Sequence, residues 1–280
     1  MTKPDIGIGY RHALDAWTRK NLTRFDTLEV IVDHCFHGNP ARRDGIFQLA
    51  REIPIVAHGI GLSIGTDVPL DISYVDEVAR AIERLGASAY SEHLAFTRVP
   101  GRDLMNLMPL PRTIAVAEAI VAKVRAIRAV LPVPFLLENI AYVFEWPEPE
   151  MDEASFLNLV LAESGAGLLL DIENVRLNAR NHRLDAAGFI DRLPPGSVQQ
   201  VHLAGGAAVT EPFLDAPFHA DSHSHPVSDE ALDLLARVLA RHKPTHIILE
   251  RDTRLSETDE ILADIAAIRS RIAGAGDIAT

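Results

Sequence analysis

Six short apolar runs in this sequence lead directly to side chains that bind metal ions. These side chains are imidazoles and carboxylates, which suit iron, manganese or zinc. Buried parallel strands have the composition of such runs, and in a barrel all their C-terminal ends meet on one face. The sequence therefore predicts a metal centre assembled from six separate segments. The residues concerned are His58, His93, Glu138, Asp171, His202 and Glu250.

A further group of ligand types lies in a segment that contains no apolar run. Asp221, His223 and His225 alternate in the sequence Asp-Ser-His-Ser-His. Alternate residues of an extended segment lie on one side of it, so these side chains can converge. One ion takes about four to six ligands, so the surplus predicts two or three ions. Carboxylates such as Glu138 and Asp171 would then bridge neighbouring ions.

Alternating strand and helix signals place these residues in an α/β fold. Two more apolar runs precede the six, which makes about eight strands, the number that closes a (β/α)8 TIM barrel of about 250 residues. We therefore expect one TIM-barrel catalytic domain over residues 1–280. The expected strands are 5–9, 28–32, 53–57, 87–90, 133–137, 167–170, 198–201 and 245–249.

Amphipathic segments between the strands have the apolar spacing of helices. Good N-cap residues stand at or just before several of their starts. Two long connections, 96–111 and 204–227, are expected to be loops of the kind that carries substrate specificity. The expected helices are 71–85, 110–133, 152–162, 229–240 and 258–272, and the expected caps are Asp71, Asp152, Ser228 and Ser256.

Composition excludes several classes of protein. The chain has 280 residues, a formal charge of −12 and one cysteine, Cys35. A lone cysteine excludes an intrachain disulfide and a zinc site built on thiolates. The negative charge and the lack of a basic run argue against a nucleic-acid partner. No segment resembles a signal peptide or a membrane span, so we expect a cytoplasmic protein with no membrane partner.

The ligand types alone leave three reactions open. These are hydrolysis of a phosphodiester or amide by metal-bound hydroxide, isomerisation of a sugar at a two-metal barrel site, and oxygen chemistry at iron. A catalytically inert barrel that serves as a scaffold is a fourth possibility, and the six intact ligand positions argue against it.

Seven motifs, in order along the chain, resemble those of a known family. They are similar to the motifs of the multinuclear non-haem iron-dependent oxidative enzymes, the family of the methanobactin biosynthesis oxidase. The resemblance extends from Gly7 to about Asp252. The motifs are His-Gly-Ile-Gly-Leu-Ser at 58–63, Ser-Glu-His-Leu at 91–94, Leu-Glu-Asn-Ile at 137–140, Leu-Asp-Ile-Glu-Asn-Val at 170–175, His-Leu-Ala-Gly at 202–205, Asp-Ser-His-Ser-His-Pro-Val at 221–227 and Glu-Arg-Asp at 250–252.

The resemblance implies a TIM barrel that holds two or three iron ions and uses O2 as co-substrate. It implies oxidative modification of a residue, usually cysteine, in a ribosomally synthesised precursor peptide. It also implies a separate small protein that binds the leader of that peptide. By position, the implied metal ligands are His58, His93, Glu138, Asp171, Asn174, His202, Asp221, His223 and Glu250, and the implied catalytic residues are Glu138, Asp171 and His225.

Two positions depart from the family pattern. The family often has histidine where this chain has Gly206, and aspartate or glycine where it has Ser224. A missing histidine would remove a substrate contact. The main alternative is a zinc- or manganese-dependent phosphodiesterase similar to the abasic-site endonuclease barrel, and a sugar isomerase-like barrel is a further one. The charge of −12 argues against the endonuclease, whose substrate is DNA.

Overall fold

The computed structural model describes residues 3–210 and 218–277. Eight strands form a closed parallel barrel in the order β1-β12-β9-β8-β7-β4-β3-β2, which confirms the predicted TIM-barrel fold class. The chain divides into two compact units, residues 28–169 and residues 1–27 with 170–280, and each unit is described by itself. The expectation of one catalytic domain over 1–280 stays a prediction.

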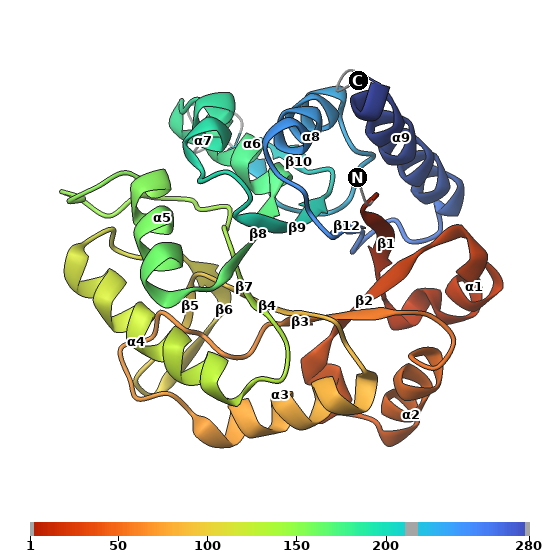
Figure 1. Cartoon of the computed structure of the whole chain (residues 1–280), viewed down its shortest axis with the longest axis horizontal. Coiled ribbons are helices and arrows are strands. Elements are labelled where there is room, and N and C mark those ends of the chain that lie inside the picture. The colour runs from red at the N-terminus through yellow and green to blue at the C-terminus, as the bar shows by residue number, and fades with distance from the viewer. Residues whose placement is uncertain (1–2, 211–217, 278–280) are drawn as a thin grey trace. The chain divides into compact units, whose positions relative to one another are not determined.

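The unit of residues 28–169 contains strands β3, β4 and β7, whose parallel register sets the positions of their side chains. Helices α2 to α5 lie on the outer side of these strands (Figure 1). Ala89, Leu136 and Leu169 form a buried core cluster here. The elements are β2 (Thr27–Ile31), η3 (Val32–Cys35), α2 (Pro40–Leu49), β3 (Ile55–Gly59), α3 (Ile72–Leu85), β4 (Tyr90–His93), β5 (Phe96–Val99), β6 (Arg102–Met108), α4 (Ile114–Val130), β7 (Phe135–Glu138), α5 (Glu153–Ser164) and the start of β8 (Gly167–Asp171).

The second unit pairs β12 with both β1 and β9, again in parallel. Arg251 is buried in this unit, and its guanidinium donates to Asp264 Oδ2 at 2.7 Å. The elements are β1 (Asp5–Gly9), η1 (His12–Leu14), α1 (Asp15–Lys20), η2 (Leu22–Arg24), α6 (Ile172–His182), α7 (Ala186–Arg192), β9 (Val198–Leu203), β10 (Ala207–Val209), β11 (Phe218–Ala220), α8 (Asp229–Arg241), β12 (His246–Leu249) and α9 (Thr258–Asp277).

Three of the four predicted helix caps are confirmed. The side chains of Asp71, Asp152 and Ser228 each accept a hydrogen bond from the backbone N–H of the third residue beyond, at the starts of α3, α5 and α8. The prediction for Ser256 is wrong, because α9 begins two residues later, at Thr258.

The two expected long loops contain short antiparallel hairpins. Strands β5 and β6 lie within 96–111, and β10 and β11 lie within 204–227. Five of the eight expected barrel strands also end too early, at positions where β3, β4, β7, β8 and β9 continue by one to three residues. β3 runs from Ile55 to Gly59 and includes His58, and β4 runs from Tyr90 to His93, so both histidines belong to the strands and do not follow them.

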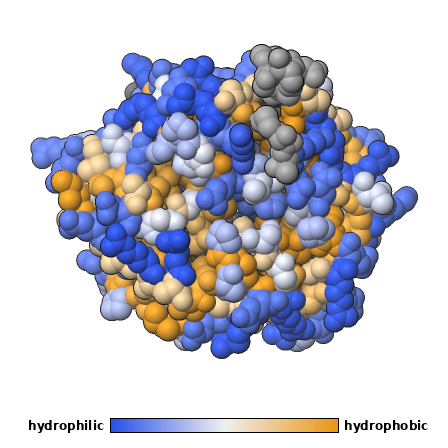
Figure 2. All heavy atoms as spheres, viewed as in Figure 1, coloured by the Kyte–Doolittle hydropathy of each residue, from blue (hydrophilic) through white to orange (hydrophobic). Residues whose placement is uncertain are grey.

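The described helices include none that combines the length and apolarity needed to cross a bilayer. In Figure 2, apolar atoms reach the surface in the part of the view where Figure 1 shows α3 and α4. Ile72 and Ile114, the first residues of these helices, are about half exposed, at 51% and 53%. Scattered apolar exposure of this kind is ordinary for a folded protein.

A substitution at Gly7 would test how closely β1 packs against Thr27. A Cβ at this position would lie 2.2 Å from the carbonyl oxygen of Thr27, a backbone atom that cannot easily move, whereas a Cβ at Gly274 in α9 would meet nothing within 4 Å. We expect Gly7→Ala to lower the free energy of unfolding by about 2 kcal/mol or more, because overpacking is destabilising. Gly274→Ala should raise it by about 0.5–1 kcal/mol, because alanine favours a helix. Urea unfolding measures both, and equal effects of the two substitutions would contradict the packing described.

Candidate metal centre

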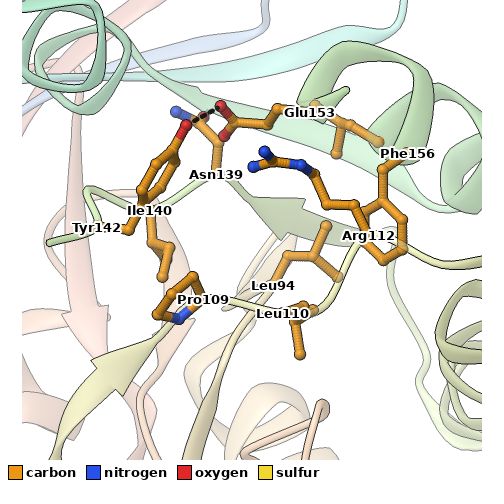
Figure 3. Close-up of a pocket in the computed structure, with 10 residues that line it drawn as sticks. Leu94, Pro109, Leu110, Arg112, Asn139, Ile140, Tyr142, Glu153 and Phe156 are labelled. Atoms are coloured by element: carbon orange, nitrogen blue, oxygen red, sulfur yellow. Dashed lines mark hydrogen bonds between the residues drawn. The ribbon is translucent and has the colours of Figure 1, made fainter. Parts of the chain in front are cut away.

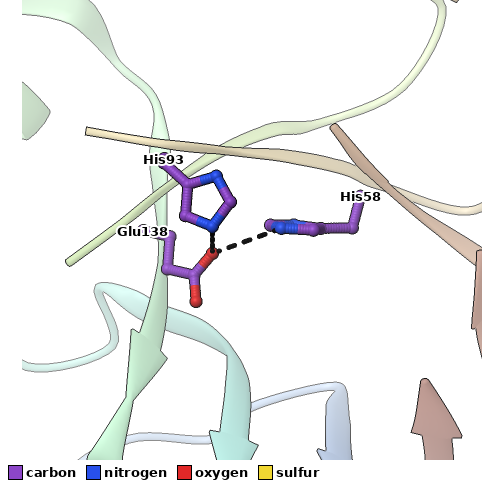
Figure 4. A group of neighbouring side chains, drawn as sticks. All are labelled: His58, His93 and Glu138. Carbon is purple, nitrogen blue, oxygen red and sulfur yellow. Dashed lines mark ion pairs between the residues drawn. The ribbon is translucent and has the colours of Figure 1, made fainter. Parts of the chain in front are cut away.

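Two histidines and a carboxylate converge in the unit of residues 28–169. Glu138 Oε2 lies 3.5 Å from His58 Nε2 and 3.4 Å from His93 Nε2. Figure 4 shows both rings directed at this one oxygen. The two rings lie nearly perpendicular, with centroids 4.7 Å apart. These three side chains are called cluster 1.

Strand register explains why cluster 1 forms. His58 of β3 lies opposite Ser91 of β4, and His93 of β4 lies opposite Glu138 of β7. Ser91 and His93 are two residues apart, so they share one face of the strand. Parallel pairing of β3, β4 and β7 therefore places all four side chains on the same face of the sheet. The register of these strands is enough to bring the side chains together.

The donor set of cluster 1 fits a metal ion. Metal–ligand bonds of about 2.0–2.2 Å place neighbouring ligand atoms roughly 3–3.5 Å apart. The distances from Glu138 Oε2 to the two imidazole nitrogens match this spacing. Ser91 Oγ lies 2.9 Å from His58 Nδ1, which turns the other nitrogen of that ring toward the cluster. A partner on the second imidazole nitrogen is the usual support of a histidine that ligates a metal.

A buried acid lies next to cluster 1, on the opposite side of β4. Glu92 is 2% exposed, and its Oε1 accepts hydrogen bonds from Leu62 N at 2.9 Å and from the Tyr90 hydroxyl at 3.1 Å. Burial and the nearby charge of Asp33 raise the pKa of Glu92 to about 8. This acid was not assigned a role from the sequence.

Cluster 2 consists of Asp171, His202 and Glu250, in the other unit. One ligand atom from each lies within 4.8 Å of the others, and all three residues are buried. His202 Nδ1 lies 3.1 Å from Glu250 Oε2. Asp171 also caps α6, because its Oδ1 accepts a hydrogen bond from Asn174 N at 2.7 Å. The spacing and the donor types again suit a metal ion.

Two residues of the segment 221–227 adjoin cluster 2. His223 Nε2 lies 2.7 Å from Asp221 Oδ1 and 3.7 Å from Glu250 Oε2. Burial lowers the pKa of His223, but the charge of Glu250 and hydrogen bonds to Asp221 and Asp252 raise it to about 12. Burial raises the pKa of Glu250, but His202 and His223 outweigh this and hold it well below its ordinary value. The carboxylates thus attract positive charge to this spot.

Two supporting residues had no predicted role. Arg11 forms ion pairs with Glu250 and with Asp252, and Asp252 Oδ2 lies 2.8 Å from His223 Nδ1. Arg11 and Asp252 therefore fix the orientation of two predicted ligands. Asp252 ends the motif Glu-Arg-Asp at 250–252, but nothing in the spacing indicates that it contacts Arg11, which lies 241 positions earlier.

Three other positions from the sequence analysis lie near the clusters. Asn174 is buried in the first turn of α6. His225 is exposed, and its Nδ1 lies 2.6 Å from the hydroxyl of Ser224. At Gly206, a Cβ would lie 2.7 Å from both Ala220 O and Glu173 Oε1, so the fold has no room for histidine there without a shift. The metal-binding role of Asn174 and the catalytic role of His225 stay predictions.

The structure thus groups the predicted ligands into two clusters, one in each compact unit. Three predicted ligands form cluster 1 and three form cluster 2, while Asp221 and His223 adjoin cluster 2. That Glu138 and Asp171 bridge neighbouring ions stays a prediction.

A small cavity in the unit of residues 28–169 contains a second, half-buried acid. Tyr142, Glu153 and the guanidinium of Arg112 face one another above an apolar floor that includes Leu94 and Phe156 (Figure 3). The Tyr142 hydroxyl donates to Glu153 Oε2 at 3.2 Å. Burial raises the pKa of Glu153 to about 7, against the opposing effects of Arg112 and Tyr142.

Comparisons with known proteins identify the family of the chain. Residues 5–273 match a protein-family model described as RiPP precursor modification enzyme MbnB/TglH/ChrH, where RiPP denotes a ribosomally synthesised and post-translationally modified peptide. A UPF0276 protein of Pseudomonas aeruginosa strain UCBPP-PA14 is 34% identical over 265 residues, which cover 94% of this chain and 90% of that protein. A UPF0276 protein of Streptomyces avermitilis is 34% identical over 279 residues, and the chain spans only 55% of its length.

The fold also matches solved structures at low sequence identity. The xylose isomerase domain protein from Planctomyces limnophilus superposes with a TM-score of 0.63 at 13% identity, over 97% of this chain and 99% of that one. At this level of identity the likeness concerns the fold alone.

A substitution at Ser91 would test whether its hydrogen bond to His58 supports metal binding by cluster 1. We expect Ser91→Ala to weaken metal binding by about 10- to 100-fold, because His58 loses the partner that orients its ring. Ser88→Ala is the matched control, because Ser88 is exposed and precedes the same strand. Chelator competition followed by metal analysis measures the affinity. Equal metal affinity in the two variants would show that the Ser91 hydroxyl does not orient the ligand.

Glu153 gives a prediction on stability and pH. Its pKa is raised from 4.5 to about 7 on folding, so the folded state binds the proton more tightly than the unfolded state. The contribution of Glu153 to the free energy of unfolding therefore falls as the pH rises from about 4.5 through 7, by at most about 3 kcal/mol. Glu153→Gln should remove this loss, so the variant gains stability relative to the unmodified protein at pH 8 but not at pH 4.5. Urea unfolding at both pH values measures it, with Glu148→Gln, an exposed site, as control.

Proposed function

The chain belongs to the family of RiPP precursor modification enzymes MbnB/TglH/ChrH, and from this premise we propose that it is a multinuclear iron- and O2-dependent enzyme. Its substrate would be a ribosomally synthesised precursor peptide, in which it oxidatively modifies one residue, most often cysteine. The observation that carries the proposal is the pair of histidine and carboxylate clusters built from the predicted ligands.

The choice of iron follows from the donor set and the reaction. Both clusters offer imidazole and carboxylate ligands, which suit iron, manganese and zinc. Zinc has no redox chemistry, so it would not support oxidation of a peptide. A substrate thiolate also needs a metal that tolerates a soft ligand beside nitrogen and oxygen donors, and iron meets this requirement.

The residues of the chain would have distinct roles in this reaction. Bound iron supplies one-electron chemistry with O2 and a Lewis-acid contact for the substrate thiolate. His58, His93 and Glu138 would bind one ion, and Asp171, His202 and Glu250, with Asp221, His223 and Asn174, would bind the others. Ser91, Arg11 and Asp252 would orient ligands. We also propose that Glu138 and Asp171 bridge ions and that His225 contacts the substrate.

The partners follow from the substrate. We propose a precursor peptide and a separate small protein that binds its leader, in the cytoplasm, with no nucleic-acid or membrane partner. The formal charge of −12 supports the exclusion of nucleic acid.

Metal analysis and oxygen dependence test the proposal together. Protein purified under nitrogen and loaded with Fe(II) should modify a cysteine-containing precursor peptide, taken from the neighbouring reading frames, in air but not under nitrogen. Glu138→Ala should lose roughly one bound iron per chain and reduce turnover by at least about 100-fold. The reason is that Glu138 Oε2 lies at ligand spacing from both histidines, so its removal takes away the carboxylate ligand of the ion they would share.

Glu118→Ala, on the exposed side of α4, is the matched control and should keep its iron. Turnover under nitrogen, full iron content in Glu138→Ala, or activity with zinc alone would each contradict the proposal. Activity with zinc on a phosphodiester would favour the hydrolase alternative.

A further inference from the structure

The segment that carries Asp221 and His223 is held by hydrogen bonds more than by burial. Each of residues 218–223 is half-buried or exposed. On the C-terminal side of the two predicted ligands, the carbonyl oxygen of Gly205 accepts a hydrogen bond from Ser224 N at 2.9 Å. A segment with little apolar packing depends on its hydrogen bonds for a fixed position. The contacts on its N-terminal side therefore bear on where the ligand atoms lie.

On that side, the side-chain amide of Asn181 binds both backbone groups of His219. Asn181 Nδ2 donates to His219 O at 2.8 Å, and Asn181 Oδ1 accepts from His219 N at 2.9 Å. This orientation of the amide satisfies both contacts and the flipped orientation satisfies neither, so the hydrogen bonds fix which way the amide points. Asn181 lies in the last turn of α6, and His219 of β11 is two residues before Asp221.

The amide of Asn181 takes the place of a partner strand at the outer edge of β11. In the antiparallel hairpin, His219 lies opposite Ala208 of β10. The N–H and C=O groups of one strand residue point to the same edge. Both groups of His219 bond to Asn181, so they point away from β10. The contact therefore fixes where β11 lies along α6, and with it where the chain enters the segment of Asp221.

Helix α6 connects this contact to cluster 2. The helix begins directly after Asp171, a predicted ligand of that cluster, whose side chain caps it. In its first turn, Glu173 Oε1 accepts from Gly206 N, the residue before β10, at 2.7 Å. An α-helix of 11 residues is a stiff rod of about 16 Å. It therefore holds Asp171 at one end and Asn181 near the other at a fixed separation, and both strands of the hairpin are attached along it.

We propose that Asn181 is a positioning residue, which holds β11 in place along α6 and so sets Asp221 and His223 against Glu250. This inference rests on the proposed function for the role of Asp221 and His223 as metal ligands. His223 Nε2 lies 2.7 Å from Asp221 Oδ1 and 3.7 Å from Glu250 Oε2. Metal–ligand distances tolerate errors of only about 0.2 Å, so even a small shift of β11 would impair binding of an ion at these atoms.

Amide hydrogen exchange tests the contact in the metal-free full chain. Asn181→Leu keeps a side chain of similar size and removes both hydrogen bonds, and Asn181→Ala is a second, smaller variant. Asn39→Leu is the matched control, because Asn39 Oδ1 accepts a backbone hydrogen bond from Ala41 N at 2.8 Å in the other unit. We expect exchange of the amides of residues 218–223 to rise by about 5- to 30-fold in both Asn181 variants, the effect of one to two hydrogen bonds, and to stay unchanged in Asn39→Leu.

Cobalt binding tests the consequence for the ligands. Co(II) binds imidazole and carboxylate groups, and its visible absorption reports the ligands around it. The metal-free full chain is titrated with Co(II) alone under nitrogen. We expect Asn181→Leu to weaken the binding of one ion by about 10- to 100-fold and to change its absorption, while Asn39→Leu matches the unmodified protein. His223→Ala, which removes a predicted ligand, should weaken the same ion at least as much.

Equal exchange at residues 218–223, or equal Co(II) affinity, in Asn181→Leu and Asn39→Leu would overturn the inference. Full Co(II) binding by His223→Ala would overturn the ligand role on which both this inference and the proposed function depend. Neither measurement uses oxygen or a peptide. Failure of the oxygen test with weakened Co(II) binding in Asn181→Leu would therefore count against the proposed reaction and leave the positioning role of Asn181 standing.

Discussion

The site depends on parallel strand register, which holds ionisable side chains together where they are largely shielded from water. A buried carboxylate is costly unless opposite charges or hydrogen bonds surround it. In cluster 1, Glu138 is 2% exposed and has an imidazole on either side, one of them fixed through Ser91. A metal ion compensates such a group more completely than neutral imidazoles can, because it brings full positive charge to the point where the ligand atoms meet.

Cluster 2 meets the same constraint by different means. Here His202, His223 and Arg11 surround the carboxylate of Glu250, and Asp252 joins the last two of these. The carboxylates hold the pKa of His223 high, which shows how strongly this environment attracts a cation. The predicted ligands Glu250 and His223 are therefore linked electrostatically to Arg11 and Asp252. Substitution of Arg11 or Asp252 would change the charge and the orientation of those ligands.

The predicted ligands proved easier to identify than the residues that orient them. A strand that ends in His or Glu can be recognised from a short stretch of sequence, because the apolar run and the polar residue that follows it are neighbours in the chain. The contact of Arg11 with Asp252 joins segments 241 residues apart, and no local pattern marks it. The hairpins were missed for another reason. β6 is largely exposed, and its apolar residues do not alternate with polar ones, so it lacks the pattern that distinguishes a half-buried strand from a loop.

The sequence by itself determined the fold class, the approximate strands and the types of side chain that gather at the candidate site. It could do so because apolar periodicity and residue type are properties of short segments. Tertiary structure decided that the imidazoles of His58 and His93 both lie next to Oε2 of Glu138. It also decided that Arg11 forms an ion pair with Glu250 and that no room remains for a side chain at position 206. Those facts depend on register and packing between distant segments, which the local pattern of residues does not encode.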